Sequence, residues 1–129
     1  MIMDASALLA ILFQEPEAAQ FATMLSQADA PCMSAVSYLE VAIRIDGQNS
    51  IVAVQAFEAF MELSAISIEP VSLSQMRLAR RAYAQYGKGR HRASLNFGDA
   101  FAYALAKERD ESLLFKGDDF IHTDVRRAG

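Results

Sequence analysis

Short apolar runs alternate along the chain with longer stretches in which apolar residues recur every three or four positions. The short runs have the length of strands and occupy residues 1–4, 31–34, 66–71 and 112–116. The longer stretches have the period of helices and occupy residues 7–14, 17–28, 35–46, 50–65, 73–86 and a last segment that starts near residue 96. Short strands separated by helices predict an α/β domain with a mainly parallel sheet covered by helices.

Polar residues mark where several of these elements begin. Either Asp4 or Ser6 can cap the first helix, and either Ser34 or Ser37 can cap the third. The segment "GKGRHRAS", which follows the helix over 73–86, is typical of a loop. The chain contains no internal repeat, low-complexity tract or linker, so residues 1–129 are predicted to form a single domain.

Composition narrows the class of protein. With 53% hydrophobic and 22% charged residues, the chain is globular and not disordered. No apolar run approaches the ~18 residues of a membrane span, and the start "MIMDASALLA" lacks the basic region of a signal peptide. The single cysteine, Cys32, excludes an internal disulfide and a multi-cysteine zinc site, and it fits a protein of the reducing cytoplasm. The two histidines, His91 and His122, fit surface or loop positions.

Positive charge is concentrated in one part of the chain, although the net charge is −4. No acidic residue lies between Glu69 and Asp99. The same interval contains six of the 12 lysine and arginine residues, which we call the basic block: Arg77, Arg80, Arg81, Lys88, Arg90 and Arg92. Such a block is the electrostatic footprint of a protein that binds a polyanion. A solvated helix face followed by a flexible basic loop explains it equally well.

Acidic residues occupy positions that a parallel sheet can bring together. Asp4 ends the first strand, and Asp118 and Asp119 follow the last one. Asp99 lies in the first turn of the last helix, and Glu40 lies on a partly apolar face of the third. In open α/β sheets, ligands bind outside the carboxyl ends of the strands. These acids can therefore converge on one edge of the sheet.

Each acid also has an ordinary structural explanation. Asp4 can be a helix cap, and Asp99 can be a first-turn acid that the helix dipole favours. Glu40 can pair with Arg44 one helical turn later. The two aspartates after the last strand can be turn residues. A bound cation would instead explain all of them together, because clustered carboxylates repel one another until positive charge neutralises them.

Four segments, in this order, make the chain resemble a known family. They are "MIMDASALLAIL", "SAVSYLEVAIR", "LNFGDAFAYALAK" and "LLFKGDDFIHTDV", and their order extends over nearly the whole chain. In these segments the chain resembles the PIN-domain ribonucleases, and within them the VapC-type toxins of type II toxin–antitoxin pairs. The resemblance implies a PIN-like sandwich, in which helices flank a short, mainly parallel sheet and acidic residues line a cleft.

The resemblance also implies which residues form the site. The matching catalytic acids are Asp4, Glu40, Asp99 and one of Asp118 and Asp119. Related toxins often have "KGNDF" at the last position, which favours Asp119 as the residue whose charge matters. Ser6 matches the small hydroxyl residue that follows the first acid. Ala5 departs from the family pattern, because many relatives have threonine there.

The activity that the resemblance implies is metal-dependent hydrolysis of RNA. Mg²⁺, with Mn²⁺ as an alternative, prefers the carboxylate and water oxygens that such acids provide, and it supplies positive charge to a phosphate under attack. Asp4 and Asp99 are expected to be the principal metal ligands. Glu40 is expected to bind a second ion or to orient water, and the last acid to act through water. The basic block is expected to hold the RNA backbone near these acids.

The implied partners are a second copy of the chain and a VapB-type antitoxin whose C-terminal segment covers the active site. Apolar residues on more than one helix face, such as Phe57, Phe60 and Met61, support a homodimer or a partner groove. A well-filled core explains the same residues as simply. The number of metal ions, one or two, stays open.

Two other classes of protein share parts of this pattern. A receiver domain of two-component signalling is a small α/β fold with an acidic pocket, but it needs an acidic pair after its first strand, and Asp4 is followed by alanine. It also needs an aspartate after its third strand, which "ISIEPV" does not provide. A non-catalytic PIN-fold module that binds RNA or protein is the second alternative. The complete acid set argues against it, and metal-dependent nuclease activity would separate the two.

Overall fold

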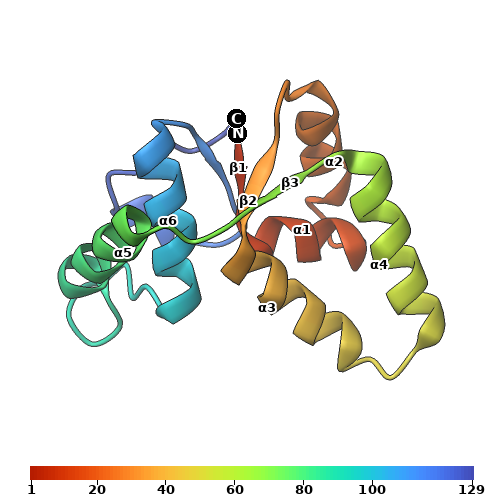
Figure 1. The fold of residues 1–129 in the computed structure, drawn as a ribbon, viewed down its shortest axis with the longest axis horizontal. Coiled ribbons are helices and arrows are strands. Elements are labelled where there is room, and N and C mark those ends of the chain that lie inside the picture. Colours follow the sequence, from red (N-terminus) through yellow and green to blue (C-terminus); the bar gives the residue numbers. More distant parts are fainter.

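The computed structural model describes residues 1–129 and contains a four-stranded sheet in the order β3–β2–β1–β4 (Figure 1). The strands are β1 (Ile2–Met3), β2 (Cys32–Ser34), β3 (Ser67–Glu69) and β4 (Leu113–Leu114). All neighbouring strands pair in parallel, with Ile2 of β1 opposite both Cys32 and Leu113. The predicted α/β class and parallel sheet are therefore confirmed, although all four strands are shorter than the apolar runs that predicted them.

Helices cover both faces of this sheet. They are α1 (Ala5–Leu12), α2 (Ala18–Gln27), α3 (Ala35–Asp46), α4 (Ile51–Ser64), α5 (Leu73–Tyr86) and α6 (Phe97–Arg109), followed by the short 3-10 helix η1 (Phe120–His122). Helices α5 and α6 lie on one side and α1 to α4 on the other (Figure 1). The predicted sandwich is confirmed, and η1 is the one helix that the sequence pattern did not predict. None of the helices has the length and apolarity that crossing a bilayer requires.

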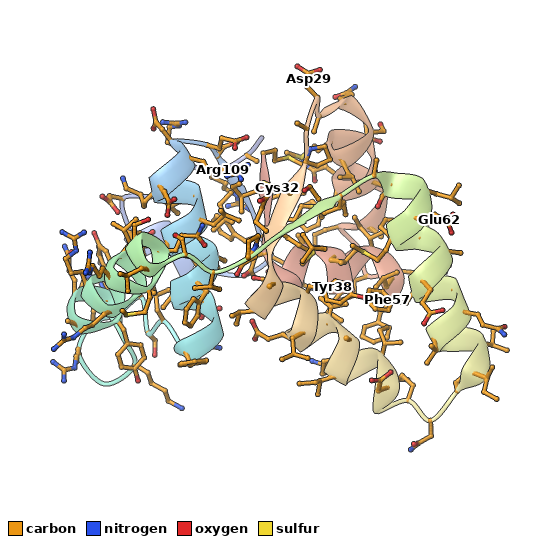
Figure 2. All side chains as sticks on the ribbon, viewed as in Figure 1. Asp29, Cys32, Tyr38, Phe57, Glu62 and Arg109 are labelled. Carbon is orange, nitrogen blue, oxygen red and sulfur yellow. The ribbon has the colours of Figure 1, made fainter.

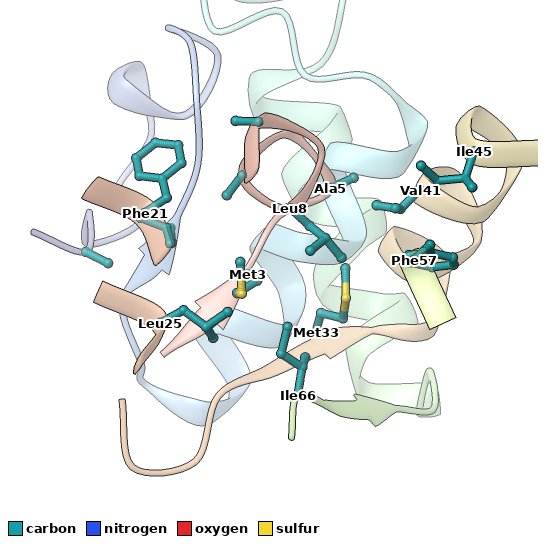
Figure 3. Packing of buried hydrophobic residues seen from close by; sticks show 14 residues of the cluster. Met3, Ala5, Leu8, Phe21, Leu25, Met33, Val41, Ile45, Phe57 and Ile66 are labelled. Carbon is teal, nitrogen blue, oxygen red and sulfur yellow. The ribbon is translucent and has the colours of Figure 1, made fainter. Parts of the chain in front are cut away.

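Successive strand residues fill the two cores of the sandwich. Met3 and Leu114 belong to the cluster packed under α1 to α4 (Figure 3). Their neighbours Ile2 and Leu113 belong to the cluster packed under α5 and α6. Side chains alternate between the faces of a strand, and strands covered on both faces are apolar throughout. This double burial explains why β1 and β4 are apolar throughout, whereas β3 is mostly exposed and contains Ser67 and Glu69.

The apolar residues of α4 that suggested a partner surface are taken up by the core. Phe57 is buried and lies beside Tyr38 of α3, with ring centroids 5.5 Å apart (Figure 2). Phe60 and Met61 are partly buried and pack against the same cluster. For these three residues the well-filled core is the correct explanation. Exposed large apolar side chains occur at other positions, on α3, α4, α5 and α6 and also at Phe13, Ile68, Val71 and Ile121.

Polar caps fix the starts of the helices that surround the site. Asp4 caps α1, Ser34 caps α3 and Asn96 caps α6 through side-chain oxygens. Helix α1 therefore begins at Ala5, earlier than the predicted start at residue 7. Ser37 is not the cap of α3; it is buried, and its hydroxyl has no hydrogen-bond partner. Because the strands are parallel, the residues that follow them meet at one edge of the sheet.

Candidate active site

A cleft of about 420 Å³ opens at the carboxyl edge of the sheet. It is lined by Asp4, Ala5, Ser6, Leu9, Glu40, Ile43, Arg44, Asn96, Asp99 and Asp119. Four of the five predicted acids therefore surround one cleft, although they come from distant parts of the chain. A larger hollow of about 740 Å³ lies between α2 and α4, but Asp29 is the only charged residue in its lining. The smaller, acidic cleft is the candidate site.

Asp4 is held at the end of β1 by a short chain of hydrogen bonds. Its Oδ2 atom accepts from the backbone N–H of Ser6 at 3.0 Å and from the Ser6 hydroxyl at 2.6 Å. The same hydroxyl oxygen accepts from the backbone N–H of Lys116, beyond β4, at 3.0 Å. Asp4 is only 4% exposed, and its Oδ1 atom accepts no hydrogen bond from the protein. Capping thus occupies one carboxylate oxygen and leaves the other for a ligand.

Asp99 likewise combines a capping role with a place in the cleft. It forms a capping box with Asn96: the Asp99 N–H donates to Asn96 Oδ1 at 2.8 Å, and Asp99 Oδ2 accepts from the Asn96 N–H at 3.0 Å. The side chain is 8% exposed and lines the cleft. The capping explanation is therefore correct without excluding a function, because one carboxylate oxygen stays outside the box.

Glu40 lies against the first turn of α6, beside Gly98, which has no side chain. A Cβ atom built on Gly98 would lie 2.2 Å from Glu40 Oε1 and 2.5 Å from Glu40 Oε2. The glycine therefore provides the space that the carboxylate occupies. The pairing of Glu40 with Arg44 is wrong, because no ion pair joins them.

The two adjacent aspartates after β4 have different positions. Asp119 lines the cleft, whereas Asp118 does not. Gly117 makes the bend with a left-handed φ of +95°, and Phe120 turns inward, since it is only 2% exposed. Phe120 packs on Phe115 with ring centroids 5.1 Å apart. This packing and the start of η1 fix which carboxylate faces the other acids.

Burial and mutual repulsion raise the pKa values of the acids in the cleft. Burial raises the pKa of Asp4. Burial, with a contribution from the charge of Asp4, raises the pKa of Glu40 to about 7. Burial also raises the pKa of Asp99 to about 7; the backbone hydrogen bond from Asn96 opposes this rise, and the charges of the other three acids add to it. A cation would relieve both the repulsion and the burial cost of these charges.

The residues fit a hard metal ion that keeps part of its water shell. No three His, Cys, Asp or Glu side chains stand close enough together to form a ready-made ligand group. The acids nevertheless line the same cleft and influence one another's pKa values. An all-oxygen donor set spread around a cleft suits Mg²⁺ or Mn²⁺ bound partly through water, because Mg²⁺ is reluctant to lose its waters.

The basic block lies outside the cleft, and all six of its residues are exposed. Arg77, Arg80 and Arg81 border a hollow of about 500 Å³ along α5. The other three residues lie in the loop between α5 and α6, whose base is closed by hydrogen bonds between Tyr86 or Lys88 and Leu95. None of the six side chains forms an ion pair. Their charges are therefore available to a polyanion, and the loop carrying three of them is tied to the start of α6.

Comparisons with known proteins identify the family of this chain. The family model described as "PIN domain" matches residues 1–126. Ribonuclease VapC28 of Mycobacterium tuberculosis is 50% identical over 129 residues, which cover 99% of this chain and 97% of the relative. Ribonuclease VapC of Mycolicibacterium smegmatis is 42% identical over 125 residues, which cover 97% of each chain.

Solved structures with low sequence identity share the fold. The crystal structure of M. tuberculosis VapC20, titled a sarcin-ricin loop cleaving toxin, matches with a TM-score of 0.78 and 14% identity, over 98% of this chain and 97% of that one. A toxin–antitoxin complex from Klebsiella pneumoniae matches with a TM-score of 0.71 and 18% identity, over 95% and 92% of the two chains.

The chain is an α/β sandwich with an acidic cleft at the carboxyl edge of its parallel sheet. With a family model that matches almost the whole chain and relatives up to 50% identical, the chain belongs to the PIN-domain family, among the VapC ribonucleases.

Three further residues belong to the surroundings of the site. Gly98 makes room for Glu40, Asn96 holds Asp99 in the capping box, and Arg44 is the only basic residue in the cleft lining. The sequence indicated Asn96 and Arg44 as local partners of their neighbours only. For Gly98 the one local signal was a glycine in the first turn of a helix, where nothing about helix formation requires it.

Proposed function

We propose that the protein is a metal-dependent endoribonuclease toxin that hydrolyses phosphodiester bonds of cellular RNA and is neutralised by a cognate VapB-type antitoxin. The observation that carries this proposal is the single cleft lined by Asp4, Glu40, Asp99 and Asp119. Residues 1–129 act as one PIN-like domain in this proposal. The complete acid set favours catalysis over a role as a non-catalytic binding module.

Mg²⁺, or Mn²⁺ in its place, is the proposed cofactor. Asp4 and Asp99 are the principal ligands, because each has one carboxylate oxygen fixed by the protein and one available. Glu40 binds a second ion or orients water, and Asp119 acts through water. When bound, such an ion polarises the scissile phosphate and promotes ionisation of the attacking water. The Ser6 hydroxyl supports the site by fixing the orientation of Asp4.

The substrate is RNA, whose backbone the acids would repel without help from positive charge. The basic block supplies that charge next to the cleft, since its loop ends at the cap of α6. The most direct test of the function is to express the protein briefly in cells and to map the new 5′ ends in total RNA. Defined ends that are absent with Asp4→Asn support the proposal. Identical end patterns for both proteins would contradict it.

A protein antitoxin is the proposed regulator. Helix α3 presents exposed apolar residues beside Glu40: Ile43, which lines the cleft, is 60% exposed, and Leu39 is 57% exposed. A chain that covers the cleft would bury them. Co-purified antitoxin is expected to abolish cleavage, and restoration of cleavage by removal of the antitoxin would show that the block is reversible.

A homodimer is the proposed assembly. Met76, Tyr83 and Phe97 are 41%, 39% and 72% exposed, and they surround an apolar hollow of about 230 Å³ between α5 and α6. A second copy would remove this surface from water. Sedimentation of the purified protein is expected to give the mass of two chains, and a shift to one chain is expected for Phe97→Asp.

We predict different effects for the two aspartates after β4. Asp118→Asn is expected to keep most of the cleavage activity, because Asp118 lies outside the cleft lining. Asp119→Asn is expected to lose much of it, because Asp119 faces Asp4 and Asp99 closely enough to raise their pKa values. Steady-state cleavage at a fixed Mn²⁺ concentration measures both. A weaker enzyme with Asp118→Asn than with Asp119→Asn would overturn the assignment of the fourth acid.

The basic block is predicted to govern RNA affinity and not the chemical step. Neutralising Arg90 and Arg92 together is expected to weaken binding and to lower the slope of log affinity against log salt by roughly 0.7 per lost phosphate contact. The single-turnover rate at saturating RNA is expected to change little. If the salt slope stays unchanged, these arginines do not contact the backbone, and the solvated-loop explanation is correct.

A further inference from the structure

Arg44 occupies an unusual position for a basic residue. It lies one helical turn after Glu40 on α3, and it is the single cation among the ten residues that line the acidic cleft. Its side chain is exposed. It forms neither an ion pair nor a hydrogen bond through its guanidinium, whereas Arg109 and Arg126 are both paired with acids.

The charge of Arg44 is not used to neutralise Glu40. The causes that raise the pKa of Glu40 are its burial and the charge of Asp4. A guanidinium paired with this carboxylate would lower the pKa instead. Although the two residues have the spacing of a helical ion pair, Arg44 points its charge elsewhere.

The guanidinium of Arg44 lies over an aromatic ring at the cleft and forms no ion pair with the acids. Its guanidinium carbon lies 5.8 Å from the ring centroid of Phe13, the residue that ends α1. A cation over an aromatic face at this distance is attracted to it. The contact leaves the N–H groups at the edge of the guanidinium available, and these match the oxygens of a phosphate in a bidentate arrangement.

The position of Arg44 complements that of the basic block. Helices α3 and α5 lie on opposite sides of α6 (Figure 1). Arg44 of α3 lines the acidic cleft, whereas Arg77, Arg80 and Arg81 of the basic block lie along α5. A nucleic-acid strand crossing four acids needs positive charge on both sides, because its phosphates are repelled along the whole cleft. The basic block alone supplies it on the α5 side only.

We propose that Arg44, held on the ring of Phe13, binds a backbone phosphate of the RNA on the α3 side of the cleft. The strand is then held on both sides of the acids, with the scissile phosphate between the two contacts. This inference deepens the proposed function and rests on RNA being the substrate. Arg44 is a substrate-binding residue in this account, and Phe13 is the positioning residue that acts through it.

The test measures RNA binding separately from cleavage. Binding of a fluorescein-labelled single-stranded RNA is followed by anisotropy at several salt concentrations, in an Asp99→Asn background. Arg44→Ala is expected to weaken binding about tenfold, as loss of a hydrogen bond to a charged group does, and to lower the log–log salt slope by roughly 0.7. Arg44→Lys is expected to keep the native salt slope but only part of the native affinity. Lysine keeps the positive charge and loses the paired N–H groups that bind a phosphate in a bidentate arrangement.

Two further variants separate phosphate binding from a structural role. Phe13→Leu keeps the charge of Arg44 and is expected to weaken binding with little change of slope. Arg127→Ala is the matched control, because Arg127 also lies over a ring, 4.9 Å from the centroid of Phe115, but outside the cleft. It is expected to bind RNA as the parent does.

Different results would contradict phosphate binding by Arg44 and the proposed cleavage of RNA. In the otherwise native protein, Arg44→Ala is expected to raise KM more than it lowers kcat. An unchanged salt slope with Arg44→Ala would overturn the inference. The inference would also be overturned if Arg44→Ala changed only antitoxin binding, or only the Mg²⁺ concentration needed for activity. Absence of cleavage by the native protein, with an Arg44-dependent slope intact, would overturn the proposed catalysis and leave the RNA contact standing.

Discussion

Asp99→Asn protein is expected to cleave RNA about 100- to 1000-fold more slowly than the native protein, as loss of one strong electrostatic group in an active site does. The fold is expected to survive, because an asparagine oxygen can still accept the hydrogen bond from the Asn96 N–H that closes the capping box. The substitution also removes one charge from a group of acids that raise one another's pKa values. The metal-free melting temperature should therefore stay the same or rise.

The matched control for this prediction is Asp29→Asn. Asp29 is an exposed acid on the connection between α2 and β2, outside the acidic cleft (Figure 2). It is expected to leave both cleavage and melting temperature unchanged. Robust Mg²⁺-dependent cleavage by purified Asp99→Asn protein would remove Asp99 from the catalytic group. A collapse of the melting temperature would instead assign it a structural role alone.

Gly98→Ala is expected to reduce cleavage at least tenfold through displacement of Glu40. The added methyl group would lie 2.2 Å from Glu40 Oε1, so the carboxylate must leave its place. Helix α6 itself gains from the change, since alanine favours a helix by about 1 kcal/mol over glycine. We therefore expect activity to fall while thermal stability changes little or increases, a combination that damage to the fold would not produce.

A double-mutant cycle tests whether Gly98 acts through Glu40. In a Glu40→Ala background the space beside Gly98 is empty, so Gly98→Ala is expected to cause no additional loss of activity. If the two losses instead multiply, Gly98 affects cleavage by another route. The cycle is read from single-turnover rates, with melting temperatures of all four proteins as the measure of folding.

Much of the fold could be predicted from local patterns of apolar residues in the sequence. The apolar runs of the strands and the periodic helices were predictable because burial on both faces of a sheet, or on one face of a helix, leaves a direct trace in the sequence. Asp4 and Asp99 were recognisable for a related reason. Each stands at a strand end or a helix start, where a parallel sheet gathers ligands.

The features of the site that the sequence did not predict depend mainly on contacts between distant segments. Nothing near Gly98 indicates that Glu40, from α3, packs on it. The helical spacing allowed an ion pair between Glu40 and Arg44, but no such pair forms, and the guanidinium of Arg44 lies over the ring of Phe13. The choice of Asp119 over Asp118 came from the family resemblance and not from the apolar pattern, because η1, which starts directly after Asp119, is three residues long and too short to show a period.

The central claim, that these acids form a metal site, is tested most directly by calorimetric titration of the purified protein with Mn²⁺. The account predicts saturable binding at pH 8 that weakens below pH 7, because Glu40 and Asp99 have pKa values of about 7 and a protonated carboxyl does not bind the ion. Asp4→Asn is expected to weaken the binding strongly, and Asp29→Asn to leave it unchanged. Absence of Mn²⁺ binding to the native protein, or equal binding to the native and Asp4→Asn proteins, would contradict the account.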